Sequence, residues 1–94
     1  MIRSFKDART EAFWNGRNVA QFRAFASVAR RKLDMVNAAY EIEDLRVSPG
    51  NRLEALVGDR AGQWSIRINR QWRVCFEWAE HDAYNVEIVD YHRG

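Results

Sequence analysis

The sequence is poor in residues that cross-link, kink or loosen a chain, with one Cys, one Pro and five Gly among 94 residues. The single cysteine, Cys75, excludes an intrachain disulfide and is typical of a cytoplasmic protein. The N-terminal residues lack the apolar core of a signal peptide, and no apolar run could span a bilayer, so we expect no membrane contact. With two His and no clustered carboxylates, neither a metal site nor a cofactor is expected.

Length and composition predict a single globular domain over residues 1–94. Hydrophobic residues make up 47% of the chain and aromatic residues 13%, which is typical of globular proteins and not of disordered ones. The net charge of +2 does not by itself indicate nucleic acid. Arg dominates the basic residues, however, and its planar fork suits phosphate.

The only proline marks a turn, Ser48-Pro49-Gly50-Asn51, that divides the chain into a helical half and a strand-rich half. We predict an edge strand at residues 2–5. Asp7 is a suitable N-cap for a short helix over residues 8–14, which Asn15-Gly16 ends.

A longer helix is predicted over residues 19–36, because apolar residues recur there at steps of three and four. Four basic residues lie mostly off this stripe: Arg23, Arg30, Arg31 and Lys32. We interpret them as a solvated helix face, with contact to an RNA backbone as the alternative. We predict a short helical connection over residues 38–45.

The second half changes to a period of two, which predicts strands. The predicted strands cover residues 52–56, 63–69, 72–78 and 84–90. A strand, two helices and then a meander of antiparallel strands make an α+β fold. One sheet face should take the helices, and alternation places Arg67 and Arg73 on the other, uncovered face, where we expect a binding site.

Four groups could carry chemistry: Arg73, Arg67, Glu54 and the strand end Asp90-Tyr91-His92. Metal-free RNA cleavage needs a base for the 2′-OH proton, a cation on the phosphate and an acid for the leaving 5′-oxygen. Arg suits the phosphate, His the proton transfer, and Tyr stacks on bases. Taken singly, each residue also has a structural explanation: an outward strand Arg, a solvent-facing Glu and a strand end.

Taken in order, several segments resemble the HigB, or plasmid maintenance killer, branch of the RelE/ParE toxins. They are Gly50-Asn51-Arg52-Leu53-Glu54-Ala55-Leu56, Gly58-Asp59-Arg60, Trp64-Ser65-Ile66-Arg67-Ile68-Asn69, Gln71-Trp72-Arg73-Val74-Cys75-Phe76 and Asp90-Tyr91-His92. The likeness covers nearly the whole chain with matching gaps. It implies a microbial-RNase-like α+β fold: an N-terminal strand, two helices and a curved antiparallel sheet.

The resemblance also implies an activity and partners. The chain would be the toxin of a type II toxin–antitoxin system, a metal-independent mRNA endoribonuclease that acts in the ribosomal A site and inhibits translation. Its antitoxin would be a HigA-like helix-turn-helix protein, through which alone it would contact DNA.

By the same resemblance, Arg73 would stabilise the reacting phosphate and Tyr91 would position the RNA. His92 and Asp90 would transfer protons or hold the site together. Glu54 stands where some relatives carry His, and could serve as the base. Further substrate contacts are expected from three residues: Arg60, Arg67 and Arg70.

One departure leaves other functions open: Val57 stands where many relatives carry Lys. A depleted catalytic set would also fit a non-enzymatic inhibitor of DNA gyrase, as in the ParE branch, or a weakened toxin that acts as an antitoxin-binding module. Arg73 with the tail Asp90-Tyr91-His92 favours the ribonuclease.

Overall fold

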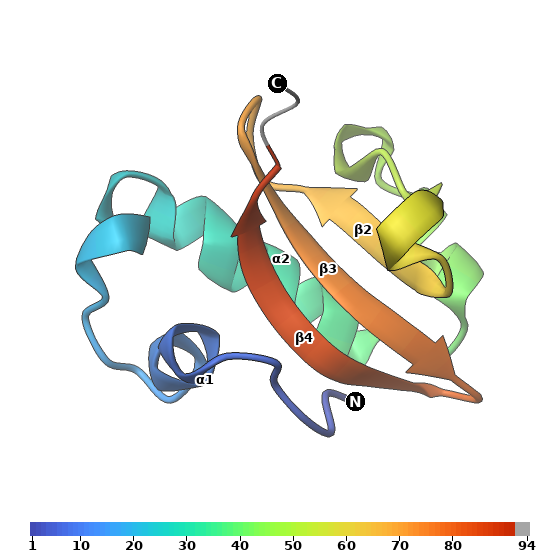
Figure 1. Cartoon of the computed structure of the whole chain (residues 1–94), viewed down its shortest axis with the longest axis horizontal. Coiled ribbons are helices and arrows are strands. Elements are labelled where there is room, and N and C mark those ends of the chain that lie inside the picture. The colour runs from blue at the N-terminus through green and yellow to red at the C-terminus, as the bar shows by residue number, and fades with distance from the viewer. Residues whose placement is uncertain (92–94) are drawn as a thin grey trace.

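The computed structural model describes residues 1–91, and within them two α-helices precede a four-stranded antiparallel sheet (Figure 1). The α-helices are α1 (Ala8–Trp14) and α2 (Ala26–Ala38), and the strands are β1 (Glu54–Ala55), β2 (Gln63–Arg67), β3 (Trp72–Ala79) and β4 (Asp82–Asp90). The 3-10 helices are η1 (Ala20–Phe25), η2 (Ile42–Arg46), η3 (Pro49–Asn51) and η4 (Gly58–Arg60). The strand order is β1-β2-β3-β4, and the predicted α+β class is confirmed.

Helix α2 lies across one face of the sheet, and the hydrophobic core lies between them (Figure 1). Leu33 and Val36 of α2 are fully buried, as are Ile66 of β2 and Val74 of β3. Apolar residues recur every three or four positions in the helix and every second position in the strands. Each element therefore has one apolar side, and burial brings these sides together.

The sheet is curved where β3 and β4 bend together (Figure 1). The register between these strands shifts between Cys75 and Glu77. In β4, Asn85 has a left-handed backbone with φ of 52°, a conformation that the first residue of a β-bulge often adopts. An extra residue on one strand increases the local bend and twist.

The N-terminal segment covers the outer edge of β4. The expected edge strand at residues 2–5 forms two isolated parallel bridges, Ile2 with Ala83 and Phe5 with Val86. Further along the edge, the hydroxyl of Thr10 in α1 accepts a hydrogen bond of 3.0 Å from the backbone N–H of Ile88. These contacts occupy donors and acceptors that an open edge would offer to another chain.

Helix α1 has the expected bounds and ends at Asn15 and Gly16, whose φ is 93°. Asp7 occupies the N-cap position, but its side chain makes no capping hydrogen bond. Its Oδ2 lies 3.5 Å from Nε of Arg9 instead, and its buried Oδ1 has no hydrogen-bond partner within residues 1–91. The capping role predicted for this side chain is therefore wrong.

The long helix expected over residues 19–36 is divided. It begins as the 3-10 helix η1 and becomes α-helical only after Phe25, whose φ and ψ are −128° and 24°. Residues three apart align in a 3-10 helix, so Phe22 and Phe25 can both contact Trp72. Their ring centroids lie 5.8 and 5.0 Å from that of Trp72. The periodicity located the apolar positions but did not show the change of helix type.

The basic residues on α2 are not all solvated. Arg31 is exposed, whereas Arg30 is partly buried and donates a 2.9 Å hydrogen bond to the carbonyl of Phe13. Lys32 is only 6% exposed. It lies beside Leu33, at the border of the apolar stripe, and its ammonium points into the protein. None of the described helices is both long and apolar enough to cross a membrane.

Replacing Leu33 with Ala should lower the free energy of unfolding by about 2–5 kcal/mol, because it removes a fully buried side chain and leaves a cavity. Chemical denaturation measures this change. Asp34→Ala, at the exposed neighbouring position, serves as control and should change stability by about 0.5 kcal/mol or less. Equal losses for both variants would contradict the packing of α2 against the sheet.

Candidate functional site

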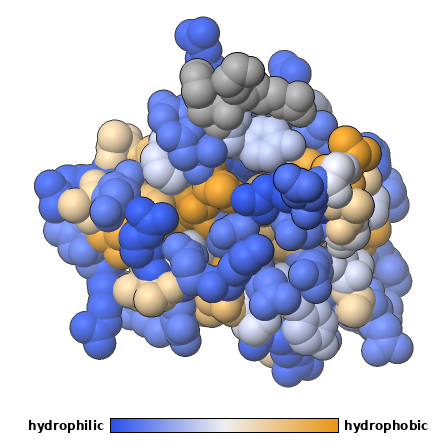
Figure 2. Space-filling model, viewed as in Figure 1, coloured by the Kyte–Doolittle hydropathy of each residue, from blue (hydrophilic) through white to orange (hydrophobic). Residues whose placement is uncertain are grey.

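The candidate site lies on the face of the sheet opposite α2, which Figure 2 shows as mostly hydrophilic around a hydrophobic band. Arg67 of β2 pairs directly with Arg73 of β3 in the antiparallel register. Directly paired residues project their side chains from the same face. The two Arg residues therefore share a face, as alternation predicts.

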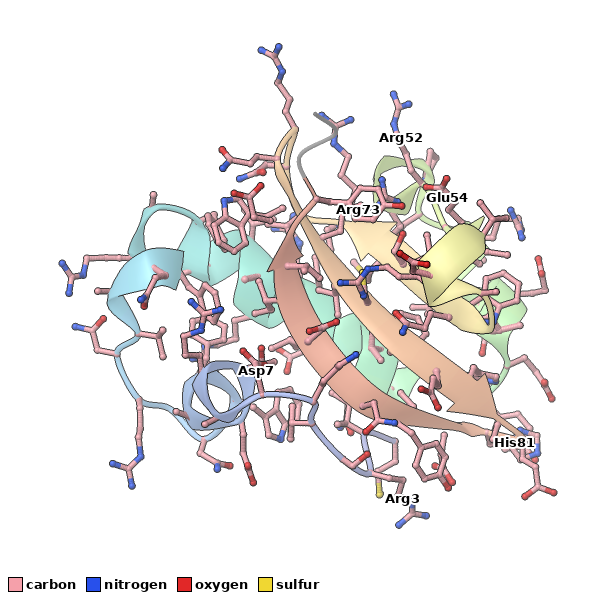
Figure 3. The ribbon with its side chains drawn as sticks, viewed as in Figure 1. Arg3, Asp7, Arg52, Glu54, Arg73 and His81 are labelled. Atoms are coloured by element: carbon pink, nitrogen blue, oxygen red, sulfur yellow. The ribbon has the colours of Figure 1, made fainter. Side chains whose placement is uncertain are left out.

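Arg73 is the centre of this face and is held in place by three neighbours (Figure 3). Its Nε donates a 2.8 Å hydrogen bond to the hydroxyl of Ser65, and its Nη2 donates one of 2.7 Å to the carbonyl of Arg52. Nη2 also lies 3.6 Å from Oε1 of Glu54. The side chain of Arg73 is only 13% exposed, so the guanidinium has little freedom to move.

The carbonyl that receives Arg73 is presented by an unusual backbone. Arg52 follows the turn η3 and has φ of 46° and ψ of 55°, the left-handed conformation. This conformation is costly for a residue with a Cβ, by about 1–2 kcal/mol. The guanidinium–carbonyl bond, which involves a charged donor, offsets part of that cost.

The strand end places Tyr91 and Asp90 differently. The guanidinium carbon of Arg73 lies 5.6 Å from the centroid of the Tyr91 ring, so the structure brings Tyr91 to Arg73. Asp90 pairs with Trp72, one residue out of phase with Arg73, and its Oδ2 accepts a 2.9 Å hydrogen bond from Nε2 of Gln71. The structure therefore does not bring the carboxylate of Asp90 to Arg73. His92 lies outside the described residues.

The other predicted substrate-binding residues differ in how firmly they are held. Nη1 of Arg60 donates hydrogen bonds of 2.9 Å to both Gln63 and Glu87, and the bond to Glu87 raises the pKa of Arg60. Nε of Arg67 donates to the backbone carbonyl of Asn69 at 3.1 Å. Arg70 is exposed in the connection between β2 and β3.

Beneath these charged groups, the residues of the sheet face are inaccessible to solvent. Ser65 and Cys75 pair across β2 and β3 and are both completely buried. The expectation of an open face is thus wrong at this point, because long charged side chains lie over the small residues. Burial raises the pKa of the Cys75 thiol to about 11.

Two further findings concern a cavity and possible metal ligands. A cavity of about 290 Å³ lies beyond the turn η3 and is lined by Met35, Ala38, Ala39, Asp44, Leu45, Val47, Ser48 and Asn51. It includes none of the charged residues around Arg73. Within residues 1–91, no three His, Cys, Asp or Glu side chains gather closely enough to bind a metal ion.

Reasoning from the sequence proposed Arg73, Glu54 and Tyr91, which the structure brings together, but missed the groups that position Arg73 and Arg60. Ser65 could have been recognised, since alternation already placed it on the face of Arg73. Glu87 could not be linked to Arg60 without the fold, because 27 residues separate them. The left-handed backbone of Arg52 has no sequence signal beyond the preceding Pro-Gly-Asn turn.

The fold is that of a known class of toxins. A solved structure, a YoeB/ParE toxin from Agrobacterium tumefaciens, aligns over 97% of this chain and 98% of its own, with a TM-score of 0.55 and 19% identity. At this identity the likeness concerns the fold alone, which is the RelE/ParE fold expected from the sequence.

The family follows from closer relatives. Residues 3–92 match the HigB-like toxins, described as the RelE-like toxin of the type II toxin–antitoxin system HigB. Toxin HigB-1 of Vibrio cholerae is 37% identical over 90 residues, which span 94% of this chain and 95% of that protein. The Proteus vulgaris protein named endoribonuclease HigB is 38% identical over 61 residues, 65% of each chain. This chain belongs to the HigB-like toxin family, which implies an antitoxin partner.

The reactivity of the Cys75 thiol tests whether the sheet beneath the charged residues is buried. At pH 8 a thiol of pKa about 11 contains roughly a hundredfold less thiolate than a free cysteine. We expect iodoacetamide to alkylate Cys75 in the folded protein at least ~100-fold more slowly than in the urea-unfolded chain. Mass spectrometry of quenched samples measures both rates. Similar rates in the two states would show that the thiol is not buried in the folded protein.

Proposed function

We propose that this toxin is an endoribonuclease that cuts mRNA in the ribosomal A site, with Arg73 as its phosphate-binding residue. The observation that supports this most is the fixed guanidinium of Arg73 between Glu54 and Tyr91. A cation, a carboxylate and an aromatic ring on one face are suited to the phosphate, the ribose hydroxyl and the base of a nucleotide. The Proteus vulgaris relative, by its name, is an endoribonuclease.

Arg73 would stabilise the charge that develops on the phosphate during cleavage. Nε and Nη2 are engaged by Ser65 and Arg52, and Nη1 has no hydrogen-bond partner within residues 1–91. The anchored guanidinium would therefore present Nη1 to a phosphate oxygen without having to be ordered first. Arg67, directly across the strand pair, adds a second positive charge on the same face.

The RNA supplies its own nucleophile. The 2′-oxygen would attack the adjacent phosphorus, its proton passing to Glu54, and the bond from phosphorus to the 5′-oxygen would break. His92 would donate a proton to that leaving oxygen. The products are then a 2′,3′-cyclic phosphate and a 5′-hydroxyl, and the reaction needs no metal-bound water.

The remaining residues would bind and order the substrate. Tyr91 would stack on a base, while Arg60 and Arg70 would contact the RNA backbone. Asp90 would act indirectly, through Gln71. Its carboxylate accepts a hydrogen bond from the side chain of Gln71, and the carbonyl of Gln71 accepts one from the backbone N–H of Tyr91. This arrangement supports a role for Asp90 in holding the site together rather than in transferring protons.

The partners follow from this activity and from the family. The antitoxin would be a helix-turn-helix protein, and the toxin would contact operator DNA only through it. The ribosome would present mRNA to the Arg-bearing face, in the cytoplasm.

Arg73→Ala should reduce mRNA cleavage by on the order of 10²–10³-fold, because it removes the main stabilisation of the transition-state charge. His92→Ala should reduce cleavage as well, since the leaving oxygen loses its acid. A purified translation system, with and without ribosomes, measures cleavage by primer extension. Arg17→Ala, at an exposed position outside the site, should cleave like the wild type.

Three other outcomes would change the assignment. Full cleavage by a folded Arg73→Ala variant would remove Arg73 from the site. No cleavage by the wild type, with inhibition of gyrase supercoiling at low protein concentration, would establish the gyrase inhibitor. No effect in either assay, with tight antitoxin binding, would establish a binding module.

Val57 offers a gain-of-function test. Its side chain is 83% exposed between β1 and Arg60, so a Lys should fit without repacking. Val57→Lys should lower KM for mRNA by a few-fold at low salt, an advantage that shrinks as salt screens the added phosphate contact. The uncharged Val57→Gln is the matched control. A salt-independent change, or the same change with Gln, would show that the added charge is not responsible.

A further inference from the structure

Lys32 is a buried cation that the proposed reaction does not use. It lies on α2, 6% exposed, and its ammonium donates a 2.6 Å hydrogen bond to Oδ1 of Asn51. Asn51 is neutral, and no carboxylate pairs with Lys32 within residues 1–91. Burial, together with the neighbouring charge of Arg31, lowers the pKa of Lys32. A buried ammonium satisfied only by an amide destabilises a fold compared with an apolar residue.

Both the oxygen and the nitrogen of the Asn51 side-chain amide are hydrogen-bonded. Asn51 is 1% exposed, and its Nδ2 donates a 3.0 Å hydrogen bond to the carbonyl of Leu45. The same Nδ2 lies 3.6 Å from the sulfur of Met35 in α2. Asn51 is the last residue of the turn η3. These contacts attach the end of the turn to the helix on the far side of the sheet.

The residue after Asn51 connects this turn to Arg73. Arg52, directly after Asn51, has the left-handed backbone, and its carbonyl accepts Nη2 of Arg73 at 2.7 Å. A residue with a Cβ keeps such a conformation only where its surroundings impose it. In this chain, the surroundings that fix the preceding residue include Lys32 and Leu45.

We propose that Lys32 is a positioning residue for Arg73. Lys32 fixes Asn51, the fixed turn keeps the carbonyl of Arg52 turned toward the strands, and this carbonyl orients the guanidinium. As far as it concerns catalysis, the inference rests on the proposed ribonuclease activity. The orientation of Arg73 itself can be tested without it.

Arg30 provides a matched comparison on the same helix. It too is a cation in α2 that donates to a carbonyl, that of Phe13, at 2.9 Å. That bond leads to α1, which contributes none of the described residues around Arg73. A purely structural role for Lys32 predicts that the two residues behave alike.

The kinetic experiment compares Lys32→Met with Arg30→Met in the ribosome-dependent assay. Misplacing a catalytic group by about 1 Å can cost up to ~100-fold in rate, so kcat of Lys32→Met should fall ten- to a hundredfold. KM should change much less. Arg30→Met should retain kcat even if it is less stable. Equal kcat values for the two variants would overturn the proposal.

A double-variant cycle separates positioning from general damage. In an Arg73→Ala background, Lys32→Met should have no further effect on kcat, because the residue through which it acts is gone. An undiminished effect in that background would show that Lys32 does not act through Arg73. Asn51→Leu breaks the same link from the other side and should reproduce Lys32→Met. It also carries the test if Lys32→Met fails to fold.

A measurement that needs no activity keeps the two proposals distinguishable. In NMR spectra of the free toxin, the Nη groups of Arg73, assigned with Arg73→Ala, should rotate slowly in the wild type. Their rotation rate should be at least several-fold higher in Lys32→Met than in the wild type. In Arg30→Met the rotation rate should equal that of the wild type. Unchanged rotation in folded Lys32→Met would overturn the positioning role. Faster rotation in a protein that never cuts RNA would keep this role and refute the ribonuclease.

Discussion

The antiparallel register of β2 against β3 is the constraint on which the site depends. It places Arg67 opposite Arg73 and Ser65 opposite Cys75, so the charged pair lies beside a pair of small residues. The small residues leave room for the Arg73 side chain to lie along the sheet and bond to Ser65. A shift of one residue would turn Arg73 into the hydrophobic core and expose Val74. The buried apolar residues of the other face forbid that shift, so core packing and site geometry are fixed by the same pairing.

Two cations directly across a strand pair repel each other, and the face contains acids that offset the repulsion. Glu54 lies 3.6 Å from Arg73, and Glu87 binds Arg60 at 2.9 Å. Glu54 is 43% exposed and Glu87 only 13%, which separates their roles. In the proposed reaction, the exposed Glu54 would yield its place beside Arg73 to a phosphate oxygen and would remain close enough to accept a proton. The buried Glu87 keeps Arg60 in place. The arrangement is therefore stable without RNA and still leaves one carboxylate able to move.

Local patterns in the sequence predicted the secondary structure and the side of each element that is buried. The period of two gave the strands and the shared face of Arg67 and Arg73, and the period of three to four gave the buried side of α2. The chemistry of the side chains singled out Tyr91 and Glu54, the family resemblance suggested roles for them, and the structure brings both to Arg73. Periodicity could not predict the contacts between distant residues, such as Lys32 with Asn51, because a cation at the border of an apolar stripe looks like a solvated one. It also could not show that Asp90 is out of phase with Arg73, since a strand's last residues alternate without indicating which neighbour they bind.

Three costly features lie on one path through the molecule, apart from others such as the left-handed backbone of Asn85 and the carboxylate oxygen of Asp7 that has no partner within residues 1–91. The buried ammonium of Lys32, the left-handed backbone of Arg52 and the desolvated guanidinium of Arg73 each reduce stability when considered alone. They are joined in sequence or by hydrogen bonds of 2.6 and 2.7 Å, and they lead from the helix to the proposed phosphate site. Strain that served only the fold would have no reason to follow one path, since an apolar residue at position 32 would pack α2 as well. A rigid cation has value where it must meet developing charge without first being ordered, and the proposed role of Arg73 would account for all three features together.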